Sequence, residues 1–253
     1  LNILTVDVGN TNIAICSFIR EKPIHFVKIR NTNLTKTILQ KHILKEYTKN
    51  SVKNVVISSV VPSVSKIVID FLTAYKIQFY LLKDLIKTLD IKINIKNKNK
   101  IGEDRIVNAY YAKKRYSKNL IIIDFGTATT FDIIDSKGNY DGGIITPGID
   151  LSLKVLSEKT AKLPLVKFAK TKNVIGRDTK SAIQSGFFWG YVSMIQGLVK
   201  NISREKKKSF RIILTGGNCN IFKSFIENVI VSDDLFNSKG LNFIMNEYLK
   251  NGY

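Results

Sequence analysis

Two stretches of this chain, nearly half its length apart, follow the same pattern. Asn2–Phe18 reads NILTVDVGNTNIAICSF, and Asn119–Asp135 reads NLIIIDFGTATTFDIID. In each, an apolar run ends in Asp, one apolar residue and a Gly follow, and a cluster of Thr or Asn leads into a second apolar run. Short apolar runs joined by such turn residues predict a β-hairpin. Asp7 and Asp124 are 117 residues apart in a chain of 253, so the pattern predicts a duplicated domain.

Each half continues with strands alternating with helices, which is typical of mixed sheets covered by helices. We therefore expect two α/β domains, residues 1–116 and 117–253, although two unrelated hairpins would leave the same local pattern. A lysine-rich polar loop at Lys92–Lys100 and a glycine-rich loop at Gly142–Gly148 separate apolar segments. The other predicted elements are strands at Val55–Val61, Phe79–Leu82 and Phe210–Thr215, and helices at Pro62–Phe71, Asp104–Arg115, Arg177–Lys200, Ile221–Val229 and Leu241–Lys250.

The chain carries 40 Lys and Arg against 20 Asp and Glu, a formal net charge of +20. Such an excess is typical of proteins that bind nucleic acid, an acidic membrane surface or an anionic substrate. Only seven of the basic residues are Arg, the residue that makes bidentate contacts in specific base recognition. The Lys residues are spread along the chain, which favours solvated lysine faces over a nucleic-acid interface.

The two cysteines, Cys16 and Cys219, lie in apolar segments, and the sequence has no Cys-x-x-Cys or Cys/His ligand spacing. This excludes a zinc finger and favours a reducing compartment. No apolar run approaches the ~20 residues that span a bilayer, and the first residues already read as a strand. We therefore expect a cytoplasmic protein that does not enter the membrane. His25 and His42 lie in segments without any motif, so we expect them to be surface or partly buried residues and not metal ligands or catalytic bases.

Both hairpin turns carry groups that suit phosphate. Asp7-Val8-Gly9-Asn10-Thr11-Asn12 offers backbone N–H groups at a Gly, a hydroxyl, and a carboxylate able to hold Mg²⁺. Asp124–Thr130 repeats the arrangement with three hydroxyls. Either turn alone could be an Asx turn that closes a hairpin. Their recurrence favours two turns that grip a polyphosphate from both sides of one cleft.

Two further segments allow a functional and a structural interpretation. Gly216-Gly217-Asn218 follows an apolar strand, which suits either a nucleoside lying against backbone or a simple helix start. Gly102-Glu103-Asp104-Arg105 places acid and base at the start of a helix. Phosphoryl transfer to an alcohol needs a carboxylate near the hydroxyl and cations to offset charge. Asp104 could equally cap the helix, and Arg105 could form a salt bridge.

Six segments make the chain resemble the type III pantothenate kinases, members of the acetate kinase, sugar kinase, Hsp70 and actin superfamily. They occur in the family's order and extend from the first strand to about Gly190. The segments are DVGNTN from Asp7, GEDRIVNA from Gly102, DFGTATTFD from Asp124, GGIITPG from Gly142, TAKLP from Thr160 and IGRDTKSAIQSG from Ile175. The resemblance implies two duplicated ribonuclease H-like (actin-like ATPase) domains, with mixed β-sheets flanked by helices and an active-site cleft between them.

The resemblance also implies ATP-dependent phosphorylation of pantothenate to 4'-phosphopantothenate, the first step of coenzyme A biosynthesis, by a homodimer. Asp104 would be the general base, Asp7 would hold Mg²⁺, and Asp124 would hold K⁺ or NH₄⁺. The residues implied to contact ATP are Asp7, Val8, Gly9, Asn10, Thr11, Asn12, Ile13, Ala14 and Thr127. The residues implied to contact pantothenate are Gly102, Glu103, Asp104, Arg105 and Thr179.

The chain departs from the family pattern beside the Asp104 segment. Lys98 stands where family members often have Pro, Ile95 where an aromatic residue is often found, and Glu103 where a small residue is commoner. These positions concern the acceptor pocket, so two other interpretations stay open. One is another kinase or phosphatase of the same superfamily, and the other is a non-catalytic regulator that senses a nucleotide or binds nucleic acid.

Overall fold

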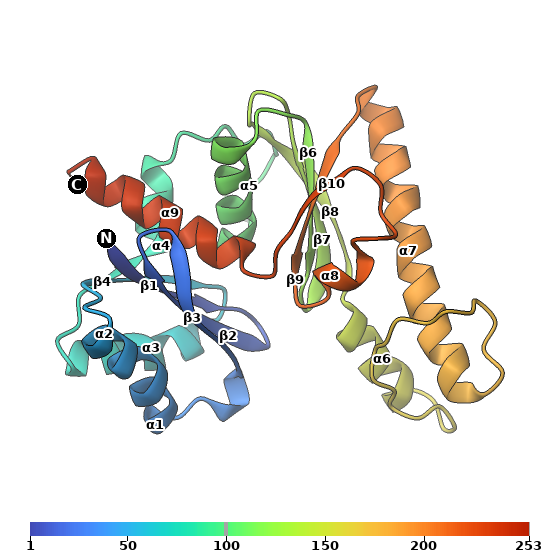
Figure 1. Cartoon of the computed structure of the whole chain (residues 1–253), viewed down its shortest axis with the longest axis horizontal. Coiled ribbons are helices and arrows are strands. Elements are labelled where there is room, and N and C mark those ends of the chain that lie inside the picture. Colours follow the sequence, from blue (N-terminus) through green and yellow to red (C-terminus); the bar gives the residue numbers. More distant parts are fainter. Residues whose placement is uncertain (99–100, 253) are drawn as a thin grey trace. The chain divides into compact units, whose positions relative to one another are not determined.

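The computed structural model describes residues 1–98 and 101–252 and divides the chain into two compact units (Figure 1). The first unit comprises Leu1–Lys92, Lys96–Arg115 and Leu235–Tyr253, and the second comprises Ile93–Ile95 and Tyr116–Asp234. Each unit is built on one mixed β-sheet. Residues 99 and 100 of the predicted loop Lys92–Lys100 lie outside the described residues.

The described part of the first unit contains one five-stranded sheet with helices on both faces. Its elements are β1 (Asn2–Val8), β2 (Asn12–Ile19), β3 (Lys22–Arg30), the 3-10 helix η1 (Asn31–Asn33), α1 (Lys36–Leu39), the π-helix η2 (Gln40–Leu44), α2 (Lys45–Lys49), β4 (Asn54–Ser59), α3 (Pro62–Ala74), β5 (Phe79–Leu81), α4 (Leu82–Leu85), the 3-10 helix η3 (Ile86–Thr88), α5 (Glu103–Arg115) and α9 (Phe236–Lys250). The strand order is β3-β2-β1-β4-β5. Strands β1, β2 and β3 are antiparallel neighbours, while β4 pairs parallel with both β1 and β5.

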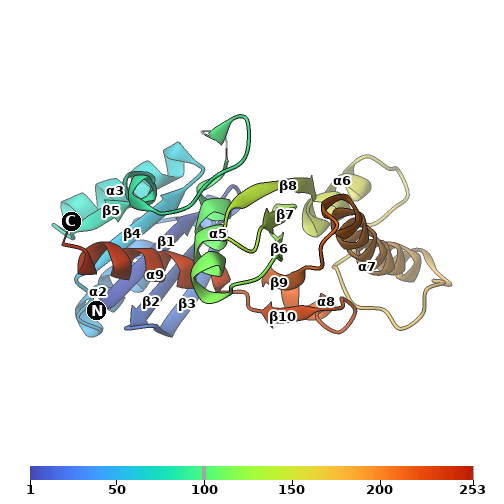
Figure 2. The same cartoon turned by 90° about the horizontal axis from the view of Figure 1, so that it is seen from above.

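Strand β1 is apolar on both faces because helices cover both sides of the sheet. Successive side chains of a strand point to opposite faces. Leu4 and Val6 accordingly pack with residues of α1, η2 and α3, whereas Ile3 packs with residues of α4, α5 and α9. Figure 2 shows α9 running across this sheet.

The C-terminal helix α9 belongs to the first unit, whereas the predicted boundaries 1–116 and 117–253 assign it to the second half. Its buried residues Leu241, Ile244 and Met245 complete the core that contains Ile3. Gly240 lets α9 approach α5 closely, since a Cβ there would lie 2.6 Å from Cγ1 of Val107. The position of α9 is therefore decided by the apolar face that it buries against the first unit. Its place in the sequence, after the second unit, does not decide it.

The described part of the second unit repeats this plan. Its elements are β6 (Leu120–Phe125), β7 (Ala128–Ile134), β8 (Tyr140–Pro147), α6 (Ile149–Glu158), α7 (Thr179–Lys206), β9 (Arg211–Gly216), α8 (Cys219–Phe222) and β10 (Val229–Ser232). The strand order is β10-β9-β6-β7-β8, with β6, β7 and β8 antiparallel and β9 and β10 parallel to β6. Read from the other end, this order matches β3-β2-β1-β4-β5 strand for strand. The predicted duplication is confirmed in the topology.

Two predicted elements of the second half are wrong. Most of the segment predicted as the loop Gly142–Gly148 belongs to strand β8, and Gly142, with a φ of +103°, lies where the pairing with β7 shifts between Tyr140 and Gly143. The segment predicted as the helix Ile221–Val229 contains only the end of the single-turn helix α8, and Val229 begins strand β10. Val229 pairs with Ile212, so sheet pairing overrides local helical periodicity.

Both cysteines are buried free thiols, as predicted. Over residues 1–98 and 101–252, no helix combines the length and apolar character needed to cross a bilayer.

Candidate active site

The first hairpin turn joins β1 to β2 and contains the predicted residues Asp7–Ala14. The N–H of Gly9 donates to the carbonyl oxygen of Asn12 at 3.0 Å and closes the turn. A Cβ on Gly9 would lie 3.3 Å from the same oxygen, so a side chain would crowd the turn. Asn10 and Thr11 at the tip are exposed, which suits a turn that receives a ligand.

Asn31 supports this turn, and nothing in the sequence singled it out. Its side-chain Nδ2 donates to the carbonyl oxygens of Gly9 at 2.8 Å and Asn10 at 3.0 Å. Its backbone N–H donates to the carbonyl oxygen of Thr11 at 3.0 Å. Asn31 opens η1 directly after β3, so the third strand carries a support for the hairpin formed by the first two.

Asp7 lies near the end of β1 in register with Ser58 on the parallel strand β4. Residues in register on neighbouring strands point to the same face, so the Ser58 hydroxyl accompanies the Asp7 carboxylate. Ser58 is buried, and its Oγ has no hydrogen-bond partner among the described residues. A buried hydroxyl without a hydrogen-bond partner is uncommon in a folded protein. Ser58 therefore places a polar group that can bind a ligand beside Asp7.

The segment Gly102–Arg105 lies at the start of α5 in the same unit. The Asp104 Oδ1 accepts a hydrogen bond from the backbone N–H of Arg105 at 2.9 Å. Burial raises the pKa of the Asp104 carboxyl, partly offset by this bond and by the Arg105 charge. A Cβ on Gly102 would overlap the Asp104 carboxylate, so Gly102 is needed for this arrangement.

Glu103 links α5 to the end of β4. Its Oε2 accepts a hydrogen bond from the backbone N–H of Ser59 at 3.2 Å, and Ser59 is in register with Val8 of the first hairpin. Burial raises the pKa of the Glu103 carboxyl, and the Asp104 and Asp84 charges add to this, while the Ser59 bond and Lys83 oppose it. Strand β4 thus connects the predicted phosphate segment with the predicted acceptor segment inside one unit.

The second hairpin turn joins β6 to β7, and the N–H of Gly126 closes it by donating to the carbonyl oxygen of Ala128 at 3.1 Å. Thr127 at its tip is exposed. Its carbonyl oxygen accepts from the N–H of Gly148 at 3.0 Å, and a Cβ on Gly148 would overlap the backbone oxygens of Gly126 and Thr127. Gly148 therefore supports the second turn from the end of β8, much as Asn31 supports the first.

Asp124 lies near the end of β6 and faces the backbone of Gly216 on β9. Gly216 has a φ of +84°, and a Cβ there would lie 2.6 Å from both Asp124 Oδ1 and the carbonyl oxygen of Phe125. The backbone nitrogen of Phe125 would lie 2.7 Å from the same Cβ, so two oxygens and one N–H group surround this position. The N–H of Gly217 donates to the same Phe125 oxygen at 3.2 Å. The Gly216–Gly217 pair consequently packs against Asp124, and its predicted contact with a nucleoside stays a prediction.

Asp132 on β7 is a fully buried carboxylate that the sequence did not mark as distinct. Its Oδ1 accepts a hydrogen bond from the Tyr140 hydroxyl at 2.8 Å. Tyr140 in turn accepts, at its carbonyl oxygen, the N–H of Asn94 at 2.8 Å. This chain of bonds holds the Ile93–Ile95 segment, including the family departure Ile95, against the edge strand β8.

Thr179 is the first residue of α7 and is exposed. The helix begins with a capping box, in which the Asp178 side chain accepts from the N–H of Ser181 at 2.9 Å and Ser181 bonds back to Asp178. Hydrogen bonds from the Ser181 hydroxyl and backbone lower the pKa of the Asp178 carboxyl. The cap fixes the first turn of α7 and so fixes the position of Thr179.

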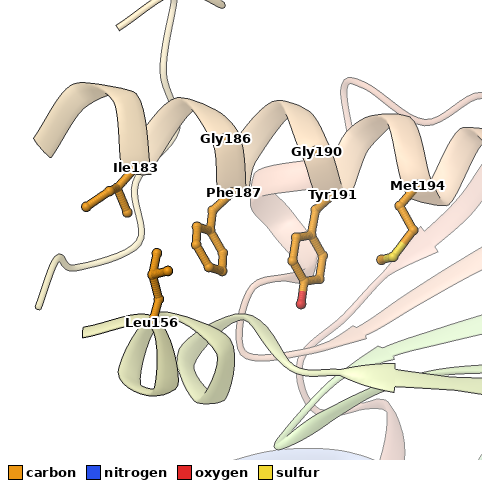
Figure 3. Close-up of a pocket in the computed structure, with 7 residues that line it drawn as sticks. All are labelled: Leu156, Ile183, Gly186, Phe187, Gly190, Tyr191 and Met194. Carbon is orange, nitrogen blue, oxygen red and sulfur yellow. The ribbon is translucent and has the colours of Figure 1, made fainter. Parts of the chain in front are cut away.

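A groove of about 360 Å³ lies between α6 and α7, and Figure 3 shows side chains from both helices meeting in it. Its lining is almost entirely apolar and comprises Leu156, Ile183, Gly186, Phe187, Gly190, Tyr191 and Met194. Leu151 and Val155 of α6 are also more than two-fifths exposed. An exposed apolar strip of this extent is typical of a surface that another protein covers.

The family model for type III pantothenate kinases matches residues 3–201. The chain belongs to this family. A type III pantothenate kinase from Persephonella marina is 41% identical over 248 residues, covering 94% of this chain and 96% of that protein. One from Pelagibacter ubique is 38% identical, with the same coverage. The family expected from six sequence segments is confirmed, and both of these relatives are kinases by name.

Solved structures give the fold alone. A candidate Baf family transcriptional activator from Campylobacter jejuni matches with a TM-score of 0.60 at 19% identity, covering 98% of this chain and 99% of that one. A candidate 2-dehydro-3-deoxygalactonokinase from Sinorhizobium meliloti matches with a TM-score of 0.56 at 11% identity, covering 97% and 96%. The predicted fold class, with two mixed sheets flanked by helices, is confirmed.

Proposed function

We propose that this chain transfers the γ-phosphate of ATP to the primary hydroxyl of pantothenate and so forms 4'-phosphopantothenate in the first step of coenzyme A biosynthesis. The supporting observation is family membership over residues 3–201 in a chain whose two units each carry an Asp-x-Gly hairpin of the same construction. The hairpins themselves do not distinguish one alcohol from another. The identity of the acceptor therefore rests on the names of the relatives.

In this proposal the ATP phosphates contact the turn at Asp7–Ala14 and the Thr127 hydroxyl. Glycine turns suit an anion because backbone N–H groups can approach it without a side chain between them. Both tips are exposed, and each turn is held from behind by a residue of another segment, Asn31 in one unit and Gly148 in the other. Preorganised turns of this kind bind a charged group without a large ordering cost.

Asp7 is proposed to hold Mg²⁺. Magnesium prefers oxygen ligands and in kinases is held by one or two carboxylates together with substrate phosphates. The Asp7 carboxylate and the buried Ser58 hydroxyl on the neighbouring strand, which has no hydrogen-bond partner among the described residues, are oxygen donors that fit this ion. When bound, the ion neutralises negative charge on the phosphates.

Asp124 is proposed to hold K⁺ or NH₄⁺. Asp124 Oδ1 and the carbonyl oxygen of Phe125 both lie beside Gly216, and carboxylate and carbonyl oxygens are the ligand types that suit hard cations. The ion supplies a fixed positive charge near the second turn. The Gly at position 216 keeps this position clear of any side chain.

Asp104 is proposed to accept the proton of the pantothenate hydroxyl as the phosphoryl group is transferred. A half-buried carboxylate with a raised pKa is a better proton acceptor than an exposed one. Gly102, Glu103, Arg105 and Thr179 would contact pantothenate, with Arg105 supplying positive charge and Thr179 a hydroxyl donor. The buried free thiols Cys16 and Cys219 and the use of ATP support a cytoplasmic setting.

We further propose a homodimer. The apolar groove between α6 and α7 and the exposed Leu151 and Val155 support a surface that a second copy covers (Figure 3). The proposal includes no nucleic-acid partner, in keeping with the scarcity of Arg among the basic residues.

The test is an ADP-release assay with the purified chain, ATP, MgCl₂, KCl and pantothenate, in which mass spectrometry identifies the phosphorylated product. We expect ADP release that depends on pantothenate and that stops when Na⁺ replaces K⁺. Full turnover in Na⁺ alone would reject the cation assignment. Preference for another alcohol or carboxylate in a panel would indicate a different kinase of the superfamily. Specific DNA binding without any ATP turnover would indicate a regulator instead.

A further inference from the structure

Asn31 directs three hydrogen bonds at three consecutive residues of the first hairpin turn. Its side-chain Nδ2 donates to the carbonyl oxygens of Gly9 and Asn10, and its backbone N–H donates to that of Thr11, at distances of 2.8–3.0 Å. These contacts span 20 to 22 residues of sequence and lie inside the first unit. Of these hydrogen bonds, the pairing of β2 with β3 needs only the backbone bond to Thr11, so the two side-chain hydrogen bonds of Asn31 are additional.

The chemistry of these contacts requires the amide group in one orientation. Carbonyl oxygens only accept hydrogen bonds, so the group that faces Gly9 and Asn10 must be the NH₂ with its two donors. The remaining Oδ1 is buried and has no hydrogen-bond partner among the described residues. The side chain is thus oriented by the turn alone, and no competing contact from Oδ1 explains its position.

Holding these carbonyl oxygens decides where the neighbouring N–H groups point. In a planar trans peptide, the C=O of one residue and the N–H of the next point in opposite directions. With the Gly9 and Asn10 carbonyls turned toward Asn31, the N–H groups of Asn10 and Thr11 point away from it. The same bonds keep two carbonyl dipoles from facing an anion on that side, where they would repel it.

We propose that Asn31 is a positioning residue that holds the first hairpin turn in the conformation that accepts a phosphate of ATP. This inference rests on the proposed function, since it takes the turn as an ATP site. It adds a residue outside the family segments to the machinery for the nucleotide. It assigns no contact between Asn31 and the substrate.

The test compares Asn31→Asp and Asn31→Ser with Asn33→Asp and Asn33→Ser. Asn33 lies in the same 3-10 helix and is exposed, which makes it a matched control. Asn31→Asp places an acceptor oxygen where the turn needs donors, and Asn31→Ser keeps the backbone bond but cannot reach both carbonyls. Loss of two hydrogen bonds, one of them part-buried and the other exposed, corresponds to roughly ten- to hundredfold in an equilibrium constant.

We expect KM for ATP, and Kd for MgADP measured by calorimetry, to rise by about that factor in both Asn31 variants, more in Asn31→Asp. KM for pantothenate should stay within about twofold of the wild type, because none of the Asn31 hydrogen bonds within the described residues reaches the acceptor segment. Both Asn33 variants should match the wild type. Amide hydrogen exchange of residues 9–12 should accelerate in the Asn31 variants only.

Unchanged MgADP affinity in a folded Asn31→Ser protein, whatever its melting temperature, would overturn the inference. Asn31 would then have a structural role only. That result can occur while pantothenate kinase activity is intact, so it does not touch the proposed function. Conversely, a wild type that binds MgADP without phosphorylating pantothenate would contradict the proposed function, while weaker MgADP binding in the Asn31 variants would still support the positioning role. A wild type that binds no adenine nucleotide would overturn both.

Discussion

Asp104 is held in an environment that opposes its own ionisation. It is half-buried at the start of α5, and desolvation raises the pKa of its carboxyl from the ordinary value of 3.8. Above the raised pKa the folded protein must keep a poorly solvated charge. Because the unfolded chain ionises this group more easily, stability is lost as the pH rises from the unfolded-state pKa of about 3.8 to the raised folded-state pKa, and no more is lost above it. A residue with this property is expected at a site where reactivity matters more than stability.

The change Asp104→Asn should therefore lower kcat and raise stability at neutral pH. We expect a kcat lower by a factor of about 100 or more, because the amide cannot accept the hydroxyl proton. The melting temperature should rise at pH 7.5, and the gain should shrink toward zero as the pH falls toward about 3.8, below which the wild-type carboxyl is protonated in both the folded and the unfolded state. Steady-state kinetics and thermal unfolding between pH 4 and about pH 8 measure both effects.

Asp70→Asn is the control, since Asp70 lies exposed on α3 and only joins a solvent-screened pair with Lys66. Asp70→Asn should leave both kcat and the melting temperature almost unchanged. An Asp104→Asn protein that is folded and turns over at the wild-type rate would reject the assignment of the base.

At the scale of elements, each Asp-x-Gly hairpin depends on a residue from a distant segment. The second hairpin needs Gly216, which combines a φ of +84° with space for the Asp124 carboxylate. We expect Gly216→Ala to destabilise the protein by about 2 kcal/mol or more, since an L-residue is strained at that φ and its Cβ would overlap Asp124 Oδ1 and the Phe125 backbone. Urea unfolding measures this, and activation by K⁺ should weaken in parallel.

Gly197→Ala is the matched control for this change. Gly197 lies inside α7, and a Cβ there meets nothing within 4 Å. It should stabilise the protein by about 0.5–1 kcal/mol, because Ala loses less conformational freedom than Gly in a helix. Equal effects of the two changes would show that the space beside Asp124 has no structural importance.

The sequence predicted the elements whose hydrophobic period is strong, and it missed contacts that depend on tertiary pairing. The hairpins, β4, α5 and α7 follow from apolar periodicity and turn residues, with ends shifted by a few residues. Asn31 and Ser58 carry no local signal, because their importance arises only when β3 and β4 are placed beside the turn. The predicted helix at Ile221–Val229 is wrong for the same reason, since Val229 is drawn into a strand by its partner β9.

At the scale of the whole molecule, the apolar groove between α6 and α7 predicts self-association. Phe187→Asp should convert the proposed dimer to a monomer, because a charge in this groove cannot be buried without a partner. Light scattering coupled to size-exclusion chromatography measures the mass. Ile230→Asp is a control on β10, where the residue is 38% exposed and lies outside the groove. A dimer that survives Phe187→Asp would place the interface elsewhere.

The net charge of +20 is unevenly divided between the two units. The first has 23 Lys and Arg against 9 Asp and Glu, and the second has 17 against 11, so the first unit carries a net charge of +14 and the second +6. The more basic unit contains the Asp7 hairpin and the Asp104 segment, which are proposed to meet ATP and pantothenate, both anions. A positive field of this size raises the local concentration of anionic ligands and is screened by salt.

We therefore expect kcat/KM for ATP to fall several-fold as ionic strength rises from about 0.05 to 0.5 M, while kcat stays nearly constant, because screening acts on encounter and not on the bound complex. Saturating K⁺ should be kept fixed and ionic strength varied with tetramethylammonium chloride, so that cation activation is not confused with screening. Glucose at matched osmolality controls for solute effects. A kcat/KM that does not change with salt would mean that the excess lysines are solvated faces without a role in substrate capture.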